Sequence, residues 1–185
     1  MVTQTFEIHK ELIEQSKRGD RKSQHQLYSF YAKAMFNICV RMLNSVQEAE
    51  DVLQDAFCDA FGNLGSFRYE SSFGSWLKRI VINHCINHLK KKRVSLVHHD
   101  DMAMFDEPEE SPEKDEDLQL EVKKIHQAML QLPEGYRIIF SLYLLEGYDH
   151  TEISEILGIS ESTSKSQFLR AKGKIREILK VPAYE

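Results

Sequence analysis

The sequence predicts an all-α protein made of two small helical domains joined by a flexible acidic linker. Three observations support this prediction. Apolar residues recur at helical spacing through most of the chain, strand signals are nearly absent, and one acid-rich segment interrupts the periodicity. We expect helices over residues 6–18, 22–43, 46–64, 73–92, 117–131, 134–146, 150–157 and 161–179.

The predicted linker spans residues 94–117 and holds the acid excess of the chain. Residues 100–117 include ten acidic side chains and one lysine, a local charge of −9, so the rest of the chain carries +4 although the whole carries −5. Like-charge repulsion and two prolines favour a flexible segment here. We therefore expect domains at residues 1–93 and 118–185, and the acidic total does not exclude nucleic-acid binding.

The composition and the motifs limit the classes of function that this protein can have. No apolar run among the 185 residues is long enough to cross a bilayer, and the N-terminus lacks the pattern of a signal peptide, so we expect a cytoplasmic protein. Cys39, Cys58 and Cys85 are dispersed and odd in number, which is typical of reduced thiols. No phosphate loop, nucleophile elbow or catalytic carboxylate pair is evident, so we expect no catalytic site and no cofactor.

The most informative segment runs from Asp149 to Leu179 and predicts a helix-turn-helix. Asp149 and Glu152 have the spacing of a capping box at the start of a short amphipathic helix. Gly158 follows that helix at a position where a left-handed residue is needed, and Ser160 can cap the next helix.

The second helix of this pair has one apolar and one polar face. The inward seam consists of Ser164, Phe168, Ala171, Ile175 and Ile178. The outward face and its shoulders carry Ser162, Thr163, Lys165, Ser166, Gln167, Arg170, Lys172 and Lys174. Such a helix is typical of one that enters the DNA major groove, although a hairpin in an ordinary helical bundle would show the same two faces.

Two segments of the first domain carry further chemistry. Ser45 and Glu48 predict a capping box, and Asp51, Gln54 and Asp55 then share one helix face. That face is either an ordinary solvated surface or an acidic docking face for a basic partner helix.

The second segment is a basic helix that follows an aromatic loop. It carries six basic side chains and no acidic one, at Lys78, Arg79, Lys90, Lys91, Lys92 and Arg93. These cations can follow phosphates, the loop from Phe67 to Ser72 can receive unstacked bases, and the amide of Asn83 suits a base edge. We expect Phe73 and Trp76 to be core residues.

Two histidine pairs have the spacing of metal ligands. His84 and His88 lie at i and i+4 of one helix, but no general base lies between them. His98 and His99, followed by two aspartates, fall in the predicted linker. We interpret neither pair as a metal site.

The order and spacing of these features allow comparison with known families. In the first domain the informative residues are Ala49–Phe57, Phe67-Arg68, Ser75–Ile80 and Asn83. In the second they are Leu132-Pro133, Tyr136-Arg137, Glu146–Tyr148, Glu152-Ile153, Leu157–Ser160, Thr163–Gln167 and Arg170–Lys172. Together they resemble the extracytoplasmic-function (ECF) sigma factors, the small two-domain branch of the sigma-70 family of bacterial transcription initiation factors. The resemblance covers nearly the whole chain apart from the linker and the termini.

The resemblance implies partners and a role for each set of residues. Asp51, Gln54 and Asp55 would dock on the clamp helices of the RNA polymerase β′ subunit. Phe67, Ser71, Ser72 and Asn83 would capture a flipped base of the melted −10 element. Lys78, Arg79 and Lys90 to Arg93 would follow the DNA backbone there. The outward face of the last helix would meet the −35 element, as a sigma region 4 (winged-helix-like) domain does. The β flap and, as is common in the family, an anti-sigma protein are further implied partners.

The sequence departs from a frequent family form at two positions. Ser164 stands where valine is common, which forfeits some core burial, and its hydroxyl is expected to bond back to its own helix. Gln167 stands where arginine is common and would prefer adenine to guanine.

The sequence therefore predicts a non-enzymatic factor that binds core RNA polymerase and directs it to promoters. The main alternative is a helix-turn-helix regulator that binds duplex DNA without joining polymerase. A helical metalloenzyme and an adaptor that merely occupies polymerase are weaker alternatives. We also hypothesise that the acidic linker threads toward the basic RNA channel of the polymerase.

Overall fold

A computed structural model describes residues 2–95 and 116–180 of the chain, with side chains described for residues 9–92 and 122–180. Within these ranges every regular element is helical, as the sequence predicts. No helix among the described residues is both long enough and apolar enough to span a membrane. The acidic run of the predicted linker lies outside the described residues.

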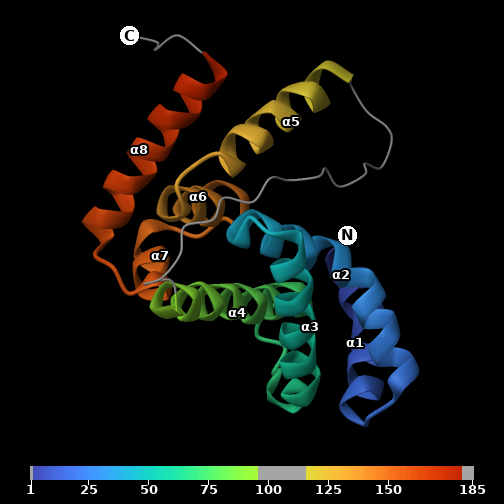
Figure 1. Cartoon of the computed structure of the whole chain (residues 1–185). Coiled ribbons are helices and arrows are strands. Elements are labelled where there is room, and N and C mark those ends of the chain that lie inside the picture. Colours follow the sequence, from blue (N-terminus) through green and yellow to red (C-terminus); the bar gives the residue numbers. More distant parts are fainter. Residues whose placement is uncertain (1, 96–115, 181–185) are drawn as a thin grey trace. The chain divides into compact units, whose positions relative to one another are not determined.

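The chain divides into two compact units, and the division falls inside the predicted linker. The first unit consists of α1 (Val2–Lys17), α2 (Arg21–Leu43), α3 (Val46–Gly62), the short 3-10 turn η1 (Leu64–Ser66) and α4 (Phe73–Ser95) (Figure 1). Helix α2 packs against α1, α3 and α4, and α3 also packs against α4. The four predicted helices are confirmed, although α1 begins at Val2 and α4 continues to Ser95.

The core of the first unit is built from one face of each helix. Its fully buried side chains include Leu27, Cys39, Met42, Leu64, Leu77, Val81, Ile82 and Cys85. Cys39 and Cys85 are buried free thiols, and Cys58 is an exposed one. This packing fixes the positions of α3 and α4, which carry the candidate functional residues.

The second unit consists of α5 (Glu116–Leu130), α6 (Glu134–Phe140), the π-helical turn η2 (Ser141–Leu145), α7 (His150–Leu157) and α8 (Glu161–Leu179). The prediction of one continuous helix over 134–146 is wrong in its second half. There the backbone hydrogen bonding becomes π-helical, because Glu146 N–H donates to Ser141 O, five residues back, at 3.1 Å.

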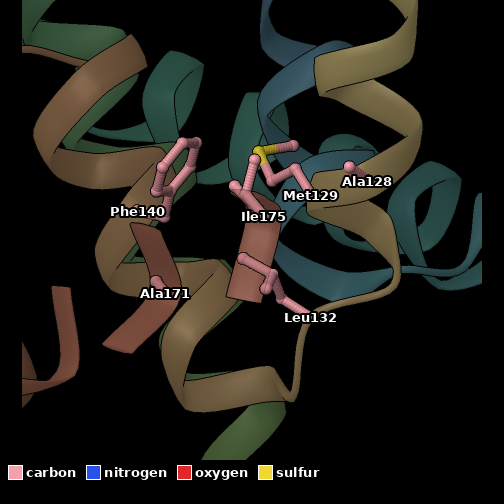
Figure 2. Packing of buried hydrophobic residues seen from close by; sticks show 6 residues of the cluster. All are labelled: Ala128, Met129, Leu132, Phe140, Ala171 and Ile175. Carbon is pink, nitrogen blue, oxygen red and sulfur yellow. The ribbon is translucent and has the colours of Figure 1, made fainter. Parts of the chain in front are cut away.

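The core of the second unit joins α5, α6 and α8. Figure 2 shows Ala128, Met129, Leu132, Phe140, Ala171 and Ile175 pointing toward one another. Arg137 is only 5% exposed, and its Nη1 donates to Leu132 O at 3.1 Å. Burial lowers the pKa of the Arg137 guanidinium. The bond fastens the end of α5 to α6, so that both helices support α8.

The predicted helix-turn-helix is confirmed. Asp149 and Glu152 form a complete capping box at the start of α7, with Glu152 N–H donating to Asp149 Oδ1 at 2.8 Å. Gly158 ends α7 with a φ of +68°, and Ser160 caps α8. Ile153 is fully buried between the two helices' inner faces, which fixes the turn geometry.

Candidate nucleic-acid interfaces

The outward face of α8 lies where the sequence places it. Ser162, Lys165, Ser166, Arg170, Lys172 and Lys174 are exposed, whereas Thr163 and Gln167 are half-buried. On the inward seam Ser164, Ala171 and Ile175 are buried, and Phe168 and Ile178 are half-buried. The helix therefore separates a polar face from a core-facing one, as a groove-binding helix must.

The polar groups of this face differ in how firmly the protein already holds them. Lys165 Nζ pairs with Glu161 at 2.5 Å, and Lys172 Nζ lies 5.7 Å from the centre of the Phe168 ring. Arg170 is exposed and has no hydrogen bond or ion pair within the described parts of the chain. Exposed pairs of this kind break at little cost, so all three cations can reach phosphates or base edges.

Gln167 is partly withdrawn from the outward face. Its Oε1 lies so close to Gly135 of α6 that a Cβ built on that glycine would stand 3.1 Å away. The half-buried amide of Gln167 must move away from α6 before it can contact a base.

Ser164 finds a different partner from the one expected. It is fully buried, but its Oγ lies 2.9 Å from Nδ1 of His150 on α7. His150 in turn stacks on Tyr143 with ring centres 4.5 Å apart. The Ser164 hydroxyl was expected to bond to its own helix. It instead joins α7 and α8, the two helices of the motif.

Leu169 was missed by the sequence prediction. It is 70% exposed in the middle of α8, beside Arg170. An apolar side chain on a groove-facing helix suits the methyl group of thymine. The sequence did contain a signal for this exposure, because Leu169 is hydrophobic and yet does not belong to the inward seam.

Helix α3 carries two kinds of acidic side chain. Glu48 binds α4 through Lys92 at 2.6 Å and His88 at 3.2 Å, and Asp59 binds His84 at 3.0 Å. The hydrogen bond from His84 lowers the pKa of the Asp59 carboxyl. The capping box predicted at Ser45 is therefore only half formed, because the Glu48 carboxylate is turned toward α4.

The acidic residues of the predicted docking face belong to a second kind, which forms no ion pair with the described side chains of α4. Asp51, Gln54 and Asp55 are all exposed. Among the described residues Asp51 and Asp55 have no ion-pair partner, in contrast to Glu48 and Asp59 on the same helix. Two unneutralised carboxylates on one face leave a negative surface that a basic partner can match.

The histidines with metal-ligand spacing are bound to carboxylates of α3. His84 and His88 contact different acids, and the described part of the chain contains no cluster of three or more His, Cys, Asp or Glu side chains suited to a metal. His98 and His99 lie outside the described residues.

The loop before α4 is held by an aromatic cluster. Phe67 is only 4% exposed, and its ring centre lies 4.7 Å from Tyr69, 5.3 Å from Trp76 and 5.7 Å from Phe73. Phe73 is buried, in agreement with the prediction that it belongs to the core, whereas Trp76 is only half-buried. The buried ring of Phe67 supports the loop from inside, and the assignment of Phe67 to the −10 surface stays a prediction.

The remaining predicted residues lie along the loop and α4. Ser71 and Ser72 are exposed, and the Ser72 hydroxyl accepts from Ser75 N–H at 3.1 Å, so it caps α4. Arg79, Asn83, Lys90 and Lys91 are exposed, Lys78 is half-buried, and Lys92 is partly occupied by Glu48. The side chain of Arg93 lies outside the described residues.

Comparisons with known proteins agree with the two-unit architecture. The family described as Sigma-70 region 2 matches residues 27–94, and the family described as Sigma-70, region 4 matches residues 123–175. These stretches contain all the predicted site residues. The first match covers α2 to α4, and the second covers most of α5 and continues into α8.

Two curated relatives match over nearly their whole length. The RNA polymerase sigma-H factor of Pseudomonas aeruginosa is 34% identical, over 95% of this chain and 95% of the relative. The ECF RNA polymerase sigma factor SigW of Bacillus subtilis is 31% identical, over 92% of this chain and 96% of the relative.

A solved structure shares the fold. The sigma factor RpoE of Bartonella quintana, in complex with the anti-sigma factor NepR, matches with a TM-score of 0.61 at 22% identity. The match covers 86% of this chain and 98% of that one. None of these relatives favours the regulator that acts without polymerase. The chain belongs to the ECF sigma factors of the sigma-70 family, transcription initiation factors that direct RNA polymerase to promoters and are not themselves catalytic enzymes.

Proposed function

We propose that this sigma factor divides its work between three surfaces of its two units. An acidic surface on α3, formed by Asp51, Gln54 and Asp55, binds the β′ clamp helices of core RNA polymerase. The observation that carries this assignment is the contrast along α3. Glu48 and Asp59 are paired with side chains of α4, whereas Asp51 and Asp55 have no ion-pair partner among the described residues. Unpaired surface carboxylates attract a basic helix and orient it before contact.

The second surface is the outward face of α8, which binds the −35 element. Arg170 and Lys165 supply mobile cations, and Leu169 supplies an apolar contact between them. Phosphate contacts set the position of the helix, and the side chains that reach base edges set its sequence preference.

The third surface comprises the loop residues 70–72, Asn83 and the basic side chains of α4, which bind the −10 element. The loop is exposed above a buried aromatic cluster, and Arg79, Lys90 and Lys91 are available to phosphates. The loop suits an unpaired strand because it offers hydroxyl and backbone groups to a base that has left the duplex.

Two further partners follow from family membership. Leu144 and Leu145 are 52% and 50% exposed in η2, and we assign the β flap contact to this apolar surface. The solved structure of RpoE is a complex with the anti-sigma factor NepR, and a partner of that kind would hold this chain away from polymerase. We place the protein in the cytoplasm, where bacterial RNA polymerase works. A pull-down from uninduced cells that recovers no such partner would count against the anti-sigma assignment.

The test is promoter-specific transcription from pooled genomic fragments by core RNA polymerase with this protein added. Asp51→Ala/Asp55→Ala should abolish polymerase binding, and Lys165→Ala/Arg170→Ala should abolish start-site selection while polymerase binding persists. Charge-matched controls are Glu11→Ala/Glu155→Ala for the acids, and Lys22→Ala/Lys33→Ala for the bases. These controls change exposed residues outside the three surfaces.

The outcomes separate the possible functions. Discrete start sites that only the first two variants lose would support the proposal. Firm binding to particular fragments without any polymerase association would instead identify a conventional DNA-binding regulator. Polymerase binding without promoter-specific transcription would identify an adaptor.

A further inference from the structure

Helix α1 holds the loop that precedes α4. The Tyr69 hydroxyl donates to Glu14 Oε1 at 2.5 Å. Lys17 Nζ donates to the same carboxylate at 3.0 Å and to the backbone carbonyl of Phe67 at 3.1 Å. The contacts from Tyr69 to Glu14 and from Lys17 to Phe67 join residues 55 and 50 positions apart along the chain, so they are tertiary contacts that no local pattern in the sequence indicates. The contact between Lys17 and Glu14 lies within one turn of α1.

The backbone of Tyr69 needs such support. Its φ of +62° lies in the left-handed region, which a tyrosine adopts at a cost because of its Cβ. A glycine would adopt this conformation freely, but it would have no side chain to reach Glu14. The position therefore keeps a tyrosine where the backbone alone favours glycine, and the side-chain contacts hold the strained geometry.

The ring of Tyr69 is held as firmly as its hydroxyl. It lies against the buried Phe67 ring at 4.7 Å, with Lys17 Nζ 4.6 Å and Lys10 Nζ 5.7 Å from its centre. The hydrogen bond from Tyr69 and the ammonium of Lys17 hold the pKa of the Glu14 carboxyl below its usual range. The carboxylate is thus ionised at neutral pH and accepts both hydrogen bonds.

The exposed part of the loop is consequently fixed at both ends. Tyr69 holds its beginning, and the Ser72 hydroxyl, which caps α4, holds its end. Glu70 and Ser71 lie between these two anchors and are exposed. A binding loop that is already ordered loses less entropy when its ligand arrives.

We propose that Glu14, Lys17 and Tyr69 form a latch by which α1 positions loop residues 70–72 to receive an unpaired base of the −10 strand. This inference rests on the proposed function, which assigns the −10 strand to that loop. The three latch residues are positioning residues. They contact the loop from behind and leave its exposed groups to the DNA.

The latch is tested with the full-length protein bound to core polymerase. We would measure its affinity for a fluorescent single strand carrying the −10 element of a promoter found by the transcription experiment, and in parallel for a −35 duplex. Tyr69→Phe, which loses one hydrogen bond, should weaken single-strand binding about threefold to tenfold. Glu14→Ala, which loses the hydrogen bonds from both Tyr69 and Lys17, should weaken it at least as much. Both variants should leave −35 duplex binding unchanged.

Two further variants distinguish positioning from general loss of structure. Glu11→Ala removes a carboxylate one turn away on α1, exposed and bonded only locally to Gln15, and should leave both affinities unchanged. Glu14→Gln keeps an acceptor for Tyr69 and should recover much of the single-strand affinity. If Glu14→Ala unfolds at a lower temperature than the wild type, Tyr69→Phe decides, because it removes a single hydroxyl from the loop.

A Tyr69→Phe protein that binds the single strand as tightly as the wild type would overturn the latch. Ser71→Ala/Asn83→Ala separates this failure from failure of the proposed function. If that variant loses single-strand affinity while the latch variants do not, only the latch is wrong. If neither loses affinity, the −10 assignment of the loop is wrong as well.

Discussion

The loop before α4 and the outward face of α8 are both candidate DNA-binding surfaces, yet the protein prepares them in opposite ways. In the loop the Phe67 ring is buried, Tyr69 is bonded to α1 and Ser72 caps a helix. On α8, Arg170 has no partner among the described residues, and Lys165 is held only by an exposed neighbour.

The difference matches the physical state of each DNA target. A single strand is flexible, so a pre-ordered loop reduces the entropy that must be lost on binding. Duplex DNA is already ordered, so adaptable side chains on one rigid helix suffice to read its groove. Under the proposed assignment of the two surfaces, the protein supplies order where the nucleic acid lacks it.

The largest expected effect concerns the rigid support beneath α8. Ile153 is fully buried in the helix-turn-helix, and Ile153→Ala should reduce the free energy of unfolding of the second unit by about 2–5 kcal/mol through lost burial and a cavity. Denaturant unfolding measures this. Leu169→Ala, an exposed apolar change on α8, should stay within about 0.5 kcal/mol. Equal losses of unfolding free energy in the two variants would contradict the exposure of Leu169 on α8.

The next effect concerns Arg170, an exposed cation of α8. Arg170→Ala should weaken binding to a −35 duplex by about 1–3 kcal/mol and relax base preference at the position it contacts. Lys172→Ala should weaken binding to all sequences and lower the slope of log affinity against log salt by about 1. Titration of labelled duplexes at several salt concentrations distinguishes the two. A uniform loss for Arg170→Ala would make it a phosphate contact.

A smaller effect concerns the paired acid of α3. Glu48 holds Lys92 and His88, with side chains between 26% and 40% exposed, so Glu48→Gln should cost the first unit no more than about 1 kcal/mol of stability. The released Lys92 should slightly strengthen binding to single-stranded DNA. Unfolding and DNA titrations of the same variant test both results. Weaker DNA binding would instead mean that Glu48 orients Lys92 for the phosphate.

The smallest effect is a pH dependence at the latch. Because the folded state lowers the pKa of Glu14 below its usual 4.5, its contribution to stability is present above about pH 4.5 and is lost as pH falls through the folded value. The wild type should therefore exceed Glu14→Ala in unfolding temperature at pH 7, and the difference should shrink below pH 4. A difference that grows in acid would show that the carboxyl is not held ionised by Tyr69 and Lys17.

The sequence predicted the fold almost completely because its signals are local. Helical periodicity, the Asp149 capping box and Gly158 each depend on residues within a few positions of one another, and each is confirmed. The one wrong element, the second half of the helix over 134–146, is a π turn. Helical periodicity does not distinguish such a turn from a regular α-helix.

The candidate site was predicted less completely, because proximity along the chain does not determine which side chains the fold engages. The ring of Phe67 is buried among other aromatic rings, and the hydroxyl of Ser164 bonds to His150 instead of its own helix. Glu48 was expected to complete a cap and binds Lys92. In each case a contact between elements prevailed over the local one.

The sequence by itself determined the helices and the family, and it predicted two domains and the residue types that could meet polymerase and DNA. Those properties follow from short-range spacing and composition, which packing does not alter. Only the tertiary structure decided which of those residues are already engaged, and by what. It paired Glu48 and Asp59 with α4, and it joined Tyr69 to Glu14 across α1. Such contacts depend on the packing of whole helices against one another, which brings together side chains that no local pattern relates.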